Sequence, residues 1–202
     1  MPLIPTALSA QAKAKAASVT VSGQKLPGIV DSIASAVSAY VLGSAQVQGT
    51  NVVLGPGSGT FTGRISGLSV STMSNLMRIS AATAGFSGRD LGKLFDSIAF
   101  GVVQSLRQTI AQGTVIGGGP GSGQSRIYAL VPKAMQAQLM AALAGRTLIG
   151  SKTSDLIKAI SFGICNHILQ NATIITTCIG VAAGPPVGPI TIPAAPGTGK
   201  LV

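Results

Sequence analysis

The chain has 202 residues, 27 of them glycine, with no tryptophan and only 3% aromatic residues. Hydrophobic residues make up 46% of it and charged residues 9%, which excludes a disordered chain, since disorder needs low hydrophobicity and high charge. Because charged residues are scarce, the surface is expected to be neutral and rich in Ser, Thr, Gln and Gly, or covered by other protein. Fourteen Lys and Arg face four acids, for a formal charge of +10.

Two markers recur along the chain with a period of about 62 to 65 residues. Asp31-Ser-Ile-Ala returns as Asp96-Ser-Ile-Ala, and a third copy appears as Ala159-Ile-Ser-Phe-Gly163. A Gly/Pro-rich tip follows each copy in the same order. We predict three tandem units, 4–68, 69–130 and 131–193, followed by a C-terminal tail, 194–202.

The first helix of each unit is expected near residues 5, 70 and 132. Pro5 and Pro132 suit the first turn of a helix, where the missing N–H costs nothing. Gly85 and Gly145 are expected to stop these helices. The apolar spacing of residues 135–143 gives one apolar face, carried by Met135, Leu139, Met140 and Leu143.

The second helix of the middle unit is predicted over 90–112, with Gly113 ending it. Its apolar stripe recurs at helical spacing and consists of Leu91, Leu94, Phe95, Ile98, Val102, Leu106 and Ile110. Two short strands are then expected around each tip. The strands after the tips are predicted at 60–68, 124–130 and 189–192.

The tips are the candidate assembly sites, because their glycines allow positive φ and their prolines preset the bend. They comprise Gly55, Pro56, Gly57 and Gly59, then Gly119, Pro120, Gly121 and Gly123, then Gly184, Pro185, Pro186 and Gly188. The fold class is thus α+β, with three helix-helix-strand-loop-strand repeats and an internal pseudo-threefold character. The three units could share one core, or each could donate strands to sheets completed by other chains.

No catalytic, metal or cofactor site is predicted. Cys165 and His167 are two residues apart on an expected helix, so they point to different faces, and a buried or interfacial histidine is the favoured interpretation. Asp90 and Asp155 stand near helix starts, where capping or the helix dipole explains them. The phosphate-loop lookalike at 145–153 has an extra serine before its lysine.

Charge and hydropathy bear on whether the chain contacts DNA, spans a membrane or is secreted. The basic residues are spread from Lys13 to Lys200, and few aromatic side chains are available for base stacking, so DNA contact is the less favoured interpretation. The stretch 156–184 contains a lysine, the histidine and three amides, so no membrane span is predicted. Pro2 and Pro5 and the late lysines are unlike a secretory signal, and a reduced protein assembled in the cytoplasm is expected.

The composition, the tandem units such as GTVIGGGPGSGQSRI (113–127) and the start MPLIPTALSAQAK resemble small virion structural proteins of tailed bacteriophages. The similarity is to the repeat-built kind found with contractile-tail and neck modules. It implies a non-enzymatic component of the tail, baseplate or head–tail region, assembled in the host cytoplasm. The partners that it implies are other virion proteins, arranged in a symmetric ring.

Two alternatives to this virion role stay open. A capsid decoration or surface-binding module would have a stable fold with exposed tips. A basic nucleic-acid-binding protein would lose affinity steeply as salt rises.

Overall fold

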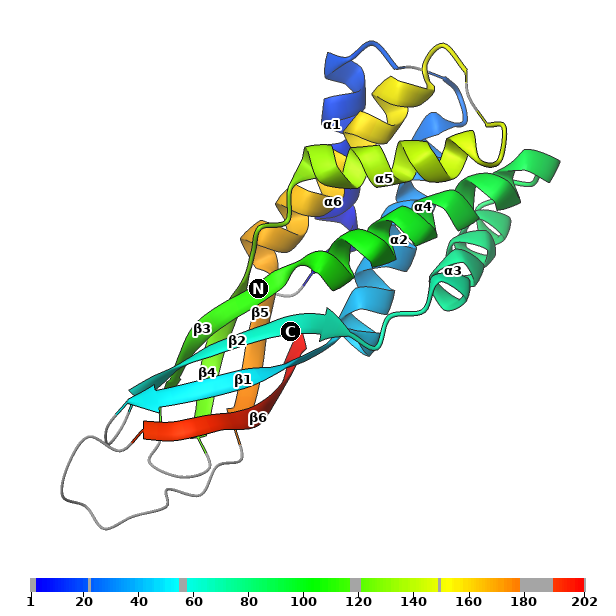
Figure 1. Cartoon of the computed structure of the whole chain (residues 1–202). Helices are drawn as coiled ribbons and strands as arrows, with labels where there is room; N and C mark the ends of the chain where they lie inside the picture. Colours follow the sequence, from blue (N-terminus) through cyan, green and yellow to red (C-terminus); the bar gives the residue numbers. More distant parts are fainter. Residues whose placement is uncertain are drawn as a thin grey trace.

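The computed structural model of the chain has a layer of helices at one end of a β-barrel (Figure 1). It describes residues 3–21, 23–54, 58–116, 121–148, 150–178 and 191–201. Within these residues there are six helices and six strands. The predicted α+β class is therefore confirmed.

Each pair of helices along the chain is followed by a pair of strands. The elements are α1 (Pro5–Ser18), α2 (Leu26–Ser44), β1 (Gln46–Leu54), β2 (Ser58–Ser66), α3 (Val70–Thr83), α4 (Arg89–Gln108), β3 (Ile110–Ile116), β4 (Gly121–Tyr128), α5 (Pro132–Ala144), α6 (Thr153–Asn171), β5 (Thr173–Cys178) and β6 (Thr191–Leu201).

The signals predicted for the ends of the first helix of each unit are confirmed. Pro5 and Pro132 are the first residues of α1 and α5. α3 has no proline, and the Ser69 side chain instead accepts a hydrogen bond from the Thr72 N–H. Gly85, two residues beyond the end of α3, has φ of +77°, a left-handed conformation that glycine adopts without strain.

The predicted end of α4 is wrong. α4 stops at Gln108, and Gly113 lies inside β3. The chain turns at Thr109, whose hydroxyl donates a hydrogen bond to the Ser105 carbonyl at 2.8 Å. From Ile110 onward the side chains point alternately toward the barrel interior and toward solvent. Ile110, counted in the helical stripe, therefore belongs to the strand.

The six strands form a closed antiparallel barrel in chain order, and β6 pairs with β1 to complete it. Gln46 lies opposite Lys200 across this closing pair. Closure leaves no free strand edge in the described part of the barrel, so the strands complete their sheet within the chain. The alternative that they complete sheets of other chains is not what the structure has.

The last strand is longer than predicted. β6 runs from Thr191 to Leu201, through most of the segment 194–202 that was predicted as a tail, whereas the predicted strand ended at residue 192. Pro193 lies at an irregularity where the β1–β6 register shifts. A proline is tolerated there because a bulge leaves one residue outside the ladder.

The barrel interior is filled by side chains that alternate with outward-facing polar residues. The inward set is buried and comprises Val47, Phe61, Ile65, Ala111, Ile127 and Ile174. The backbones approach closely at Gly113, where a Cβ would overlap backbone atoms of β4. The part of the barrel interior whose side chains the structure describes is therefore packed.

The helices form a ring above the barrel. Each helix packs against the next in chain order, and α6 packs against α1 to close the ring. One described helix, α2, is long and apolar enough to cross a membrane by length and composition, and 50% of its apolar window is buried inside the fold. Its buried face, including Val37 and Val41, belongs to the common core of helices and barrel.

Candidate functional site

Two carboxylates bridge helix pairs on the outside of the ring. Asp31 of α2 accepts hydrogen bonds from Ser9 and from Lys13 of α1, the latter at 2.6 Å. Asp96 of α4 accepts from Ser74 and from Arg78 of α3, the latter again at 2.6 Å. The same polar arrangement therefore fastens α1 to α2 and α3 to α4.

Asp96 has a further partner. The Arg146 guanidinium, from the connection between α5 and α6, donates to its second carboxylate oxygen at 2.7 Å. Burial raises the pKa of Asp96, but the hydrogen bonds from Ser74, Arg78 and Arg146 outweigh it and hold the pKa below 3.8. The pKa of Asp31 is likewise lowered, because its bonds from Lys13 and Ser9 outweigh the effect of burial.

Replacing Asp96 with asparagine is expected to lower the free energy of unfolding by about 1 kcal/mol at neutral pH, since two guanidinium groups lose their charged partner. A carboxylate whose pKa is lowered by folding contributes stability above its unfolded pKa, and that stability is lost as pH falls through the folded pKa. The difference between the variant and the wild type should thus shrink below about pH 4. Urea unfolding at a series of pH values measures it.

Asp90→Asn is the matched control. Asp90 is exposed and has only Lys93, at 3.1 Å on its own helix, as an ion-pair partner in the described residues. Its loss should change the free energy of unfolding by less than about 0.5 kcal/mol. An Asp96 variant as mild as this control would contradict the structural role of the network.

Asp31 and Asp96 stand out in the sequence as repeat markers, but their ion pairs were not predicted. The available signal was the pairing of a serine with a basic residue four positions later, as in Ser9 with Lys13 and Ser74 with Arg78. Each serine lies 22 residues before its aspartate. Arg146 is 50 residues from Asp96, and no local sequence pattern indicates that the two residues pair.

The helix pair α5–α6 has no such carboxylate bridge among its described residues and has an open groove instead. The groove has a volume of about 850 Å³, and Met140, Phe162, Lys133 and Lys158 are among its lining residues, with Lys15 contributed by α1. Met140, predicted on the apolar face of its helix, is only half-buried because it borders this groove. Met135, Leu139 and Leu143 are buried as predicted.

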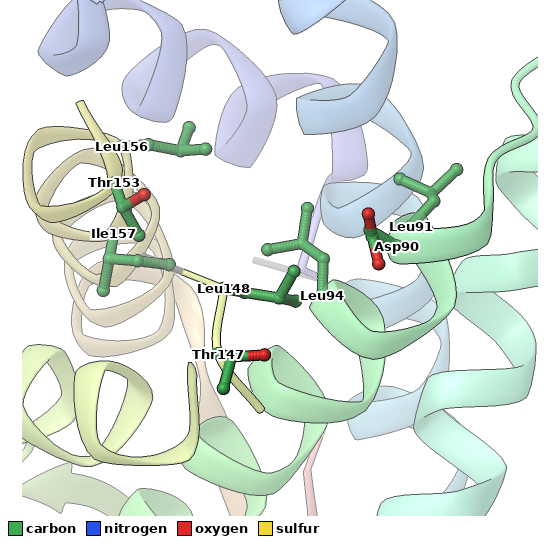
Figure 2. A pocket seen from close by; sticks show the side chains of 8 residues that line it. All are labelled: Asp90, Leu91, Leu94, Thr147, Leu148, Thr153, Leu156 and Ile157. Atoms are coloured by element: carbon green, nitrogen blue, oxygen red, sulfur yellow. The ribbon is translucent and has the colours of Figure 1, made fainter. Parts of the chain in front are cut away.

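A second hollow lies at the end of the ring that is farther from the barrel (Figure 2). It has a volume of about 450 Å³ and lies between the first turns of α4 and α6 and the connection before α6. Leu91, Leu94, Leu148 and Leu156 give it an apolar lining, and Asp90 is its charged lining residue. Thr147 and Thr153 contribute the hydroxyl groups of this lining.

The aspartates at helix starts lie where they were predicted. Asp90 and Asp155 are in the first turns of α4 and α6. Neither residue occupies the N-cap, so the favourable interaction of a carboxylate with the helix dipole is the remaining explanation.

His167 is buried, with 1% of its surface exposed, which confirms one of the two predicted environments. Its Nδ1 lies 3.1 Å from the Asn171 side-chain nitrogen, while Nε2 has no partner among the described residues. Burial lowers the pKa of His167. Burial also raises the pKa of the Cys165 thiol to about 12, and this thiol contacts the Met135 sulfur at 3.8 Å, so it remains a neutral thiol at ordinary pH.

Most of the predicted tips lie outside the described residues. This applies to Gly55, Pro56, Gly57, Gly119, Pro120, Gly184, Pro185, Pro186 and Gly188. Gly59 belongs to β2, and Gly121 and Gly123 belong to β4. These three glycines pair within the barrel as strand residues.

Basic residues recur on alternate strands of the barrel. Arg64 of β2 and Arg126 of β4 are exposed, and they lie opposite Gln48 and Gln112. Lys200 is the residue of β6 opposite Gln46. Two exposed cations therefore lie on the outer wall of the barrel, with a third basic position on the remaining hairpin.

Comparison of the chain with protein-family models, with curated proteins and with solved structures finds no match.

Proposed function

We propose that this chain is a non-enzymatic structural component of a tailed-phage virion, built from three copies of one unit and positioned on or near a symmetry axis. The observation that carries the proposal is the double closure, in which α6 packs on α1 and β6 pairs with β1. Three similar units closed into a ring can match threefold or sixfold surroundings. The tail, baseplate and head–tail region are assemblies of this kind.

Support for three related units comes from positions that share a role at the helix crossings. Gly101 of α4 packs so closely on α5 that a Cβ would lie 2.7 Å from the Leu139 side chain. Gly163 of α6 packs on α1, where a Cβ would lie 2.8 Å from Ala12. Ala36, 65 residues before Gly101, is the small residue at the corresponding point of α2. A small residue thus recurs wherever one unit meets the next.

The assembly role is supported by the surface. The chain has few charged residues and several exposed large apolar side chains, such as Ile79 on α3, Val131 just before α5, and Tyr128 and Ile175 on the barrel. The exposed Arg64 and Arg126 on the barrel wall suit acidic protein neighbours. Because the barrel is closed, we infer that contacts with neighbours use side chains and connections rather than added strands.

A second candidate, a capsid decoration or surface-binding module, is favoured by one observation. A closed barrel and a continuous core are expected to fold without a neighbour, as a decoration module must. The two candidates differ in location, since decoration proteins lie on the outer face of the capsid.

Both candidates are tested on purified native particles. Mass spectrometry of such virions should detect the chain, and cryo-electron microscopy should find it on or near a threefold or sixfold axis of the tail or head–tail region. Density on the outer capsid surface would favour the decoration module. Absence from the particle, or a single place unrelated to any axis, would contradict the axial role.

A further inference from the structure

The α5–α6 pair lacks the serine and the basic residue that bind an aspartate in the α1–α2 and α3–α4 pairs. The proline that begins α1 is followed by Ser9 and Lys13, four and eight residues later. The proline that begins α5 is followed at the same distances by Gln136 and Met140. The residues that hold the carboxylate between α1 and α2 are therefore replaced here by an amide and a thioether.

The carboxylate itself is replaced by a cation. Asp31 and Asp96 each stand two residues before a buried isoleucine of their helices, and Lys158 stands two residues before the buried isoleucine of α6. Lys158 is exposed and borders the groove. Where the other helix pairs have an aspartate that is ion-paired within the chain, this pair has an exposed lysine.

The cations of the groove lack acidic partners within the described part of the chain. There, Lys15, Lys133 and Lys158 have no carboxylate within ion-pair distance, although Asp155 borders the same groove. The Lys15 ammonium lies 5.1 Å from the centre of the Phe162 ring. Three cations against one acid leave the groove positive, next to an apolar lining.

We propose that this groove binds an acidic segment of another protein. A carboxylate of that segment lies beside Lys158, where the other helix pairs have their own aspartate, and an apolar side chain packs on Met140 and Phe162. The matching of positions rests on the three-unit organisation proposed above, whereas the binding itself does not depend on a virion role.

The chemistry of the groove favours this occupant over two others. A second copy of the chain is a poor source of carboxylates, since it has four acids and both Asp31 and Asp96 are engaged internally. A nucleic acid would use the lysines but gain nothing from Met140. A segment with both carboxylates and aliphatic side chains uses both kinds of lining.

The test is fluorescence anisotropy of the full chain with a short fluorescein-labelled peptide of Glu, Leu and Ala. We expect saturable binding that is lost when the Glu residues are replaced by Gln. Lys158→Asp should weaken binding at least about tenfold. Lys25→Asp, an exposed site beside α2 with the same change in net charge, should change it by less than about twofold.

A second variant separates loss of binding from loss of folding. Met140→Arg combined with Lys158→Asp recreates the pairing of Arg78 with Asp96, and should retain the thermal midpoint while abolishing peptide binding. The proposal is overturned if the wild type fails to bind, if Lys158→Asp binds as tightly as the wild type, or if Lys25→Asp loses as much. Equal competition by a single-stranded oligonucleotide would also overturn it. Particle localisation is independent of all these readouts.

Discussion

Gly163→Val is expected to destabilise the protein by about 3 kcal/mol, because it forces apart the two helices that close the ring. A Cβ at this position would lie 2.8 Å from the Ala12 Cβ and 3.0 Å from the Ala12 Cα and backbone nitrogen. Backbone atoms cannot rotate away as a side chain does, so α1 must move relative to α6. Chemical unfolding followed by circular dichroism measures the loss.

Gly43→Val is the matched control for this prediction. Gly43 is near the end of α2 and is exposed, and a Cβ at this position would meet no atom within 4 Å. The same substitution there should change the free energy of unfolding by no more than about 0.5 kcal/mol. Equal losses at the two sites would mean that helix propensity, and not the close crossing, sets the effect.

Phe61→Ala is expected to cost about 3 to 5 kcal/mol, since it empties the middle of the barrel. Phe61 has 0% of its surface exposed. Its ring lies over Gly63, where a Cβ would be 2.6 Å from the Phe61 Cζ. Phe61 is the largest of the described inward-facing side chains of the barrel, and the backbone pairing around it limits collapse into the space left behind.

Thr62→Ala tests whether the loss at Phe61 is due to the interior. Thr62 is the next residue of β2 and is exposed on the outer wall, so its truncation should cost less than about 1 kcal/mol. Urea unfolding of both variants gives the comparison. Similar losses would contradict a packed barrel.

Local sequence signals predicted the elements but not their closure. Pro5 and Gly85 mark helix ends through their own backbone preferences, and these preferences act whatever the rest of the chain does. The pairing of Gln46 with Lys200 depends on where the whole chain brings two distant segments. No periodicity in either strand identifies its partner, and most of β6 lies in the segment 194–202 that was predicted as a tail.

The candidate sites also differ in how far local sequence predicts them. Asp31 and Asp96 stood out because their sequence context recurs, while the groove at Lys158 arises from a departure from that recurrence. Such a departure is visible only after the helices have been aligned by their packing. Arg146 reaches Asp96 from another helix connection, and no local pattern predicts that encounter.

The contact of α6 with α1 and of β6 with β1 has a consequence during synthesis. A nascent chain presents the flanks of α1 and β1 long before the segments that cover them leave the ribosome. Two chains that finish synthesis close together can cover these flanks by exchanging their last helix pair and hairpin. We therefore expect an interlocked dimer as the misassembly of this fold, with a yield that rises with expression level.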